Sequence, residues 1–263
     1  MNVLVFDIET VPDVEAGRRL YGNRAEMANL SDEEVIRVMY HYHGYSDPGK
    51  DHEKLRPHLQ KVVAIAAVLR SGERLRMDSL GNVNTTEAEI IQQFFKSIQH
   101  YTPTLVSWDG YQVDLPVLHY RALLHKIYAQ RYWDIHQEFR FNNYTHRYHD
   151  RHTDLMDVIA GYQSNAKINL EEMSRFLELP SQPHLHSNQI ETLYFQGRLA
   201  DIRTYCEINV LNTYLIFLRF ELMRGNLEAT AYEQECQRIQ EVLANETKPH
   251  WQAFLATWIS KSR

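Results

Sequence analysis

Two carboxylates near the amino terminus give the first indication of chemistry in this chain. The apolar run from Val3 to Phe6 is short and rich in valine, which is typical of a buried strand, and Asp7 and Glu9 follow it. Because side chains alternate along a strand, both carboxylates are expected on one face. A bound divalent cation would relieve their repulsion, and oxygen ligands favour Mg²⁺ or Mn²⁺. A hydrated strand end is the alternative explanation of this segment taken alone.

Two further places combine polar side chains with elements that could position them. Asp114 stands at the mouth of an expected helix, after a short strand and the Asp109-Gly110 turn. An ordinary helix cap would explain an isolated aspartate there equally well. Tyr205 and Asn209 are four residues apart on a long apolar helix, so they share one helical face. A tyrosine that is hydrogen-bonded inside the core is the alternative for this pair.

Taken in order, these three sites resemble the DEDDy 3′–5′ exonucleases. That pattern has Asp-x-Glu on the first strand, an aspartate before a helix, and Tyr-x-x-x-Asp on a late helix. The chain most resembles bacterial proteins described as exonucleases related to the proofreading domain of family-B DNA polymerases. The resemblance extends over nearly the whole chain, with matching stretches at 1–12, 102–124, 152–158 and 205–226. It implies an RNase H-like α/β fold, in which helices flank a mixed sheet and the carboxylates gather at the end of the sheet.

The resemblance also implies a mechanism and a role for each residue. Two metal ions, Mg²⁺ or Mn²⁺ and about 4 Å apart, would activate a water and stabilise the leaving 3′-oxygen of single-stranded DNA or RNA. Asp7 would bridge both ions and Glu9 would bind the ion that activates water. Asp114 would act on the second ion largely through waters, and Tyr205 would orient the attacking water.

Position 209 departs from the family pattern, because it is asparagine where the family has aspartate. An amide oxygen can bind a hard cation, but it carries no charge and cannot take a proton from water. The substitution could be engineered or natural, or Glu207 or Asp201 could compensate for it. We therefore expect an exonuclease fold that is impaired in this form. The rival hypothesis is a nucleic-acid-binding protein without turnover. A metal phosphatase is weaker, because Tyr205 has no obvious role in one. A second departure is the 180–186 loop, which stands where the relatives have a glycine-lysine loop, so the missing lysine is expected to reduce contact with phosphate.

Residues 131–151 interleave aromatic side chains with arginines, a combination that suits single-stranded nucleic acid. The candidates for binding are Tyr132, Trp133, Arg140 and Arg147. The alternative is a loop whose aromatic rings cover the core. Three histidines at positions 146, 149 and 152 could suggest zinc, but without cysteines nearby we expect them to be solvated.

Composition limits the class of protein. The net charge of −6 argues against a polycation that coats long duplex DNA. Two cysteines form no disulfide framework, and no transmembrane segment or signal peptide is recognisable. These features predict a cytoplasmic protein with no membrane partner.

The elements expected around the sites are strands first and helices last. Ser31 with Glu34, and Thr86 with Glu89, form two capping boxes that each open a helix. A hairpin is expected to turn at Ser71-Gly72. The segment between the first strand and residue 60 is expected to contain one helix. We predict a single domain over 1–263 with a helical carboxyl-terminal extension over 224–263.

Overall fold

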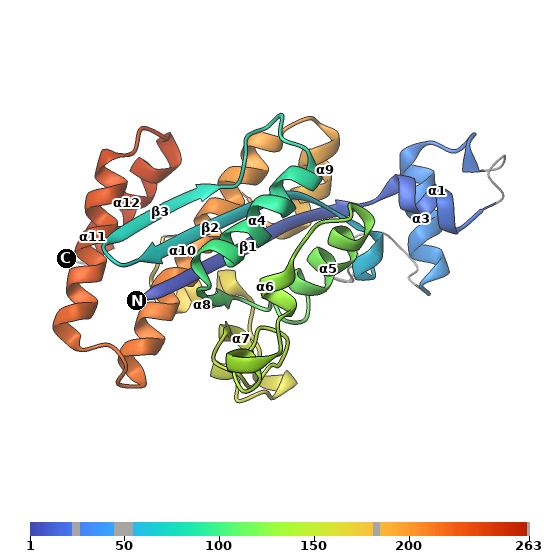
Figure 1. Cartoon of the computed structure of the whole chain (residues 1–263). Coiled ribbons are helices and arrows are strands. Elements are labelled where there is room, and N and C mark those ends of the chain that lie inside the picture. The colour runs from blue at the N-terminus through green and yellow to red at the C-terminus, as the bar shows by residue number, and fades with distance from the viewer. Residues whose placement is uncertain (23–26, 45–54, 181–184, 262–263) are drawn as a thin grey trace.

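The centre of the protein is a five-stranded sheet of order β3-β2-β1-β4-β5 (Figure 1). A computed structural model describes residues 1–22, 27–44, 55–180 and 185–261. The strands are β1 (Asn2–Pro12), β2 (Gln60–Ser71), β3 (Arg74–Ser79), β4 (Thr104–Ser107) and β5 (His152–Asp154). Strand β1 pairs antiparallel with β2 and parallel with β4, and β5 continues the sheet parallel to β4. This mixed order is the RNase H-like arrangement that the sequence predicted.

Helices follow and flank the strands over the described residues. They are α1 (Val14–Leu20), α3 (Asp32–Tyr42), α4 (Glu87–Tyr101), α5 (Asp114–Leu124), α6 (Gln130–Trp133), α7 (Leu155–Ile159), α8 (Leu170–Phe176), α9 (Ile190–Phe195), α10 (Leu199–Met223), α11 (Ala229–Asn245) and α12 (Pro249–Lys261). Both predicted capping boxes are present, at Ser31 and Thr86. None of these helices is long and apolar enough to cross a membrane.

The expectation of one helix before residue 60 is wrong, because the described part of this segment contains both α1 and α3. Helix α1 is only 7 residues long and includes Gly17, so it gives little helical periodicity. Its amino terminus is fixed by Asp13, whose Oδ1 accepts a hydrogen bond from the main-chain nitrogen of Ala16 at 3.0 Å. In Figure 1, α1 and α3 lie at the opposite end of the sheet from α11 and α12.

The sheet separates two apolar cores. Helix α10 lies on one face of the sheet, and α4 and α5 lie on the other (Figure 1). Val3 and Val5 belong to the core that includes α10, whereas Leu4 and Phe6 pack with side chains of α4 and α5. Alternation along β1 therefore continues through the acidic pair, and it directs Asp7 and Glu9 to the α10 face.

The last two helices add their side chains to the core on the α10 side. Ile239 and Leu243 of α11 are completely buried, and so is Trp251 of α12. A buried ion pair joins β2 to α11, because Arg70 Nε lies 2.6 Å from Glu235 Oε1. The extension is thus attached by apolar contacts and by charge to the strand beside β1.

Candidate active site

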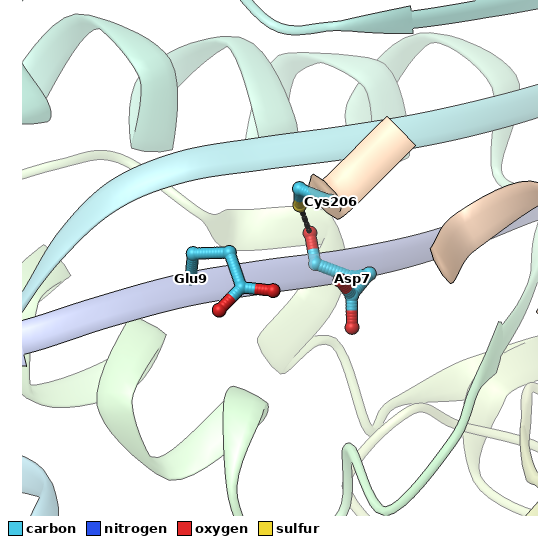
Figure 2. Close-up of side chains that lie close together, drawn as sticks. All are labelled: Asp7, Glu9 and Cys206. Atoms are coloured by element: carbon cyan, nitrogen blue, oxygen red, sulfur yellow. Dashed lines mark hydrogen bonds between the residues drawn. The ribbon is translucent and has the colours of Figure 1, made fainter. Parts of the chain in front are cut away.

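The side chains of Asp7 and Glu9 lie close together, as their spacing on β1 predicts. One ligand atom each from Asp7, Glu9 and Cys206 lies within 4.8 Å of the others (Figure 2). Asp7 and Glu9 stand opposite Ala66 and Ala64 of β2, which are both fully buried. Alanine leaves space above the strands, so α10 can lie close to the carboxylates. The β1–β2 register shifts immediately after Glu9, and such irregularities often re-aim side chains near functional sites.

Cys206 fixes α10 against β1 and presents no thiolate. Figure 2 shows its thiol directed at the main-chain oxygen of Asp7, to which Sγ donates a hydrogen bond at 3.3 Å. Burial raises the pKa of this thiol well above its ordinary value, so the sulfur keeps its proton at neutral pH. The hard donors here are therefore the carboxylate oxygens of Asp7 and Glu9. This donor set fits Mg²⁺ or Mn²⁺ better than zinc.

Asn209 and Tyr205 come from the face of α10 that meets β1. Asn209 Nδ2 donates a hydrogen bond to Asp7 Oδ2 at 3.5 Å. Tyr205 lies one turn earlier on the same face of the helix. Burial, followed by the negative charge of Glu9, raises the pKa of Tyr205, so its phenol stays protonated at neutral pH. The structure thus brings four of the five sequence-predicted residues together at Asp7.

The fifth residue, Asp114, is the buried first residue of α5. It is not the helix cap that isolated aspartates often form, because the N-cap position is Val113 and no side chain caps the helix. Strand β4 pairs with β1 as far as Val5 and Val106, so its following loop leaves the sheet near the level of Asp7. Asp114 is not a member of the 4.8 Å group formed by Asp7, Glu9 and Cys206.

The loop that carries Asp114 is held by a carboxylate that was not predicted as a site residue. Asp154 accepts hydrogen bonds from the main-chain nitrogens of Asp109 at 3.0 Å and Tyr111 at 2.9 Å. Between them, a Cβ on Gly110 would lie 2.4 Å from Ser107 Oγ, so the turn requires glycine. Burial raises the pKa of Asp154, and its backbone hydrogen bonds oppose this. The only sequence signal was an aspartate between a strand and a helix.

Neither proposed substitute for the missing aspartate reaches the site. Glu207 is buried on another face of α10, where Ser79 Oγ donates to its Oε1 at 2.7 Å. Lys248 and His250 also bind it, at 3.1 and 2.7 Å. Asp201 pairs with Arg198 near the start of the helix and is about 43% exposed. Compensation of Asn209 by Glu207 or Asp201 is therefore ruled out.

Glu207 should make stability depend on acid pH. Burial raises its pKa, but hydrogen bonds from His250 and Ser79 and the charge of Lys248 outweigh this and lower the pKa from 4.5 to about 2. A carboxylate with a lowered pKa stabilises the fold above about pH 4.5, and its contribution is lost as the pH falls toward 2. We expect Glu207→Gln to lower the free energy of unfolding by about 3 kcal/mol at pH 7.

Urea unfolding at several pH values checks this expectation. The difference between the unchanged chain and Glu207→Gln should shrink between pH 4.5 and 2. Asp201→Asn is the matched control on the same helix, and it should change stability by less than about 0.5 kcal/mol. A difference that stays constant over this pH range would contradict the assignment.

The four residues predicted to bind nucleic acid do not all lie on the surface of the protein. Tyr132 is only 2% exposed, and its ring stacks on Tyr144 with centroids 5.6 Å apart. Its prediction as a base-stacking residue is wrong, because the ring fills the core beside α4. Trp133, the next residue, is 52% exposed, and Arg140 is exposed as well. Arg147 is partly buried, with Nη2 2.8 Å from Asp157 Oδ2.

The histidines of this stretch are not all solvated. His152 is buried on β5, and its Nε2 lies 2.8 Å from Ser107 Oγ. Burial lowers the pKa of His152 to about 4, so the ring is neutral at pH 7. His146 is exposed and stacks on His149. In the 180–186 loop, residues 181–184 lie outside the described part of the chain, so the predicted loss of a phosphate contact remains a prediction.

Comparison with known proteins shows the family of this chain. Residues 52–258 match the family described as a predicted 3′–5′ exonuclease related to the exonuclease domain of PolB, and the chain belongs to this family. The match includes Asp114, Tyr205 and Asn209 and begins after the acidic pair of β1. No curated protein matches the chain.

Among solved structures, the family B DNA polymerase of the hyperthermophilic archaeon Pyrobaculum calidifontis is similar to this chain. The identity is 12% and the TM-score 0.47, over 93% of this chain and 28% of the polymerase chain. The protein thus spans little more than a quarter of the polymerase's length.

Proposed function

We propose that this chain is a metal-dependent 3′–5′ exonuclease that hydrolyses single-stranded nucleic acid. The observation that carries the proposal is the convergence of Asp7 and Glu9 on the face of β1 that α10 covers, with Asn209 at 3.5 Å from Asp7. Two carboxylates from one strand and a polar residue from a crossing helix form a set of oxygen donors. Family membership supports the same reaction class.

The residues suit a site for Mg²⁺ or Mn²⁺. Asp7 and Glu9 would supply the principal ligands, with Asp114 and the amide oxygen of Asn209 as further donors. When bound, two such ions supply an activated water and stabilise the leaving 3′-oxygen. The protonated phenol of Tyr205 can donate a hydrogen bond and so orient that water. The burial of Glu9 keeps competing solvent away from its carboxylate.

A second candidate function rests on position 209. The Asn209 amide donates to Asp7, whereas an aspartate there would add a fourth carboxylate to Asp7, Glu9 and Asp114. With less negative charge the site holds divalent cations more weakly. The contact between Asn209 and Asp7 therefore favours an alternative function. In this alternative the protein binds single-stranded nucleic acid but hydrolyses it slowly or not at all.

Degradation of end-labelled oligonucleotides tests the proposal. Single-stranded DNA and RNA, each labelled at the 5′ or the 3′ end, are incubated with the chain in Mn²⁺, in Mg²⁺ and in a chelator. A 3′–5′ exonuclease shortens the 5′-labelled strand stepwise and releases the 3′ label as a mononucleotide. Chelation should abolish both products. Tight binding of all four strands without any product would favour the second candidate.

Trp133 and Arg140 remain candidates for contact with the substrate. The exposed half of the Trp133 indole offers a stacking face, although the ring also contacts His119 at a centroid distance of 4.8 Å. We expect Trp133→Ala to weaken single-strand binding about tenfold if a base stacks there. Fluorescence anisotropy measures the affinity, and thermal unfolding separates lost binding from lost folding. A stability loss without a separate binding defect would assign the ring to the core.

A further inference from the structure

A cluster of tyrosines surrounds Arg147 beside α7. The Arg147 guanidinium carbon lies 5.0 Å from the ring centroid of Tyr162 and 5.5 Å from those of Tyr111 and Tyr148. Tyr148 is 66% exposed and Tyr162 42% exposed. Their rings meet edge to face with centroids 5.4 Å apart. We call Tyr111, Arg147, Tyr148 and Tyr162 the tyrosine cluster.

The backbone holds Tyr162 in an unusual conformation. Its φ is +61°, directly after Gly161 at +59°. A large side chain is rare in this left-handed region, where the conformation costs on the order of 1 kcal/mol or more. A hydrogen bond from the main-chain nitrogen of Tyr162 to the Asp157 carbonyl, at 2.8 Å, fixes the turn. The chain therefore accepts a backbone cost that places a partly exposed ring against Arg147.

The tyrosine cluster is tied to the loop that carries Asp114. Asp154 caps α7 and also accepts the main-chain hydrogen bond of Tyr111, three residues before Asp114. Three members of the cluster, Tyr111, Arg147 and Tyr162, line one small hollow together with Asp154, Asp157 and His152, and Tyr148 lies outside it against Tyr162. Figure 1 shows α7 below α6, at the β4–β5 side of the sheet. A single-stranded nucleic acid that reaches Asp114 would approach the protein along this side of the sheet.

Arg147 places a cation directly beside the rings. It shares Asp157 with Lys167, and Asp154 lies in the same hollow, so two cations meet two carboxylates here. Exposed aromatic faces next to a cation combine base stacking with attraction to phosphate. Neutral peptides and sugars would use the rings but gain little from the charge.

We propose that Tyr148 and Tyr162, held in place by Arg147, form a base-stacking subsite for single-stranded nucleic acid next to the loop that carries Asp114. The inference rests on the proposed exonuclease function, because it takes the same substrate to lie across Asp7 and Asp114. The binding surface then includes Tyr148 of the 131–151 stretch and Tyr162 beyond it, in place of the buried Tyr132. The rival explanation is that the rings only hold Arg147 and the loop in place.

Binding measured without hydrolysis tests the subsite. The anisotropy of a 5′-fluorescein-labelled single-stranded 12-mer is followed in a chelator for the unchanged chain, Tyr148→Ala, Tyr148→Phe and Tyr162→Asn. Asparagine tolerates positive φ, so Tyr162→Asn removes the ring without adding strain. We expect Kd to rise about tenfold for Tyr148→Ala and Tyr162→Asn. Tyr148→Phe keeps the stacking face and should bind normally. Tyr120→Ala, a half-exposed tyrosine of α5, is the control.

The outcomes separate the subsite from the nuclease. If Tyr148→Ala and Tyr162→Asn bind like the unchanged chain, the subsite is wrong while the proposed function stands. If they lose affinity only in proportion to a fall in melting temperature, the rings merely support the loop and the subsite is again rejected. If the unchanged chain binds no single strand, the subsite is rejected, and the degradation assay in Mn²⁺ decides the proposed function separately. Normal melting with a specific loss of affinity, restored in Tyr148→Phe, supports the subsite.

Discussion

Asn209→Asp is expected to raise the rate of 3′–5′ hydrolysis about a hundredfold in Mn²⁺. The side chain already lies beside Asp7, with Nδ2 3.5 Å from Oδ2, so an aspartate would occupy a position next to the acidic pair. It would replace a neutral donor by a charged ligand, and it would strengthen the binding of a hard cation. The gain should be largest at low Mn²⁺ concentration, where occupancy limits the rate.

Stability gives this prediction a readout besides activity. Without metal, a new carboxylate beside Asp7 and Glu9 adds repulsion, so Asn209→Asp should melt at a lower temperature than the unchanged chain. Added Mn²⁺ should reverse the order, because a ligand that binds only the folded state stabilises it. Asn245→Asp introduces the same charge at the exposed end of α11, where it also loses a hydrogen bond to the Glu241 carbonyl, and its melting temperature should respond to Mn²⁺ no more than that of the unchanged chain.

Two results would contradict the assignment of position 209. Equal rates for both chains, with the same dependence on Mn²⁺, would show that this position does not matter to catalysis. Inactivity of both chains on every single strand would favour the candidate without turnover. A rise in activity of Asn245→Asp would attribute the effect to overall charge.

The fold was predictable where neighbours in sequence determine the geometry. Ser31 and Thr86 each cap a helix through a glutamate three residues later, and that motif is complete within four residues. Alternation along β1 placed Asp7 and Glu9 on one face for the same reason. The shared face of Tyr205 and Asn209 follows from helical periodicity alone.

The features that the sequence did not predict depend on contacts between segments that are distant in the chain. Tyr132 and Trp133 are adjacent aromatic residues, yet only Tyr132 is buried, because α6 directs that ring between Phe95 and Tyr144. Glu207 stands two residues before Asn209, but its partners come from β3 and the carboxyl-terminal extension. No local sequence pattern indicates such partners. The sequence alone therefore left Glu207 as a candidate to compensate for Asn209, although its carboxylate is bound elsewhere.

Glu235→Ala is expected to lower the free energy of unfolding by about 3–5 kcal/mol, the largest stability effect we predict. The side chains of Arg70 and Glu235 are 8% and 7% exposed, and Arg70 Nε donates to both carboxylate oxygens at 2.6 and 2.9 Å. Removing the carboxylate leaves a buried guanidinium without its counter-charge, and Arg70 Nη1 already has no hydrogen-bond partner among the described residues. Urea unfolding at pH 7 measures the loss.

The controls distinguish a buried charge from a general weakening of α11. Glu233→Ala removes an exposed carboxylate from the same helix and should cost less than about 0.5 kcal/mol. The double variant Arg70→Met, Glu235→Leu removes both charges and keeps apolar volume, so it should recover most of the stability. If Glu235→Ala lowers the free energy of unfolding by less than about 1 kcal/mol, the Arg70–Glu235 pair contributes no more than an exposed salt bridge does. The extension would then be held to β2 by apolar contacts alone, through the buried side chains of Ile239, Leu243 and Trp251.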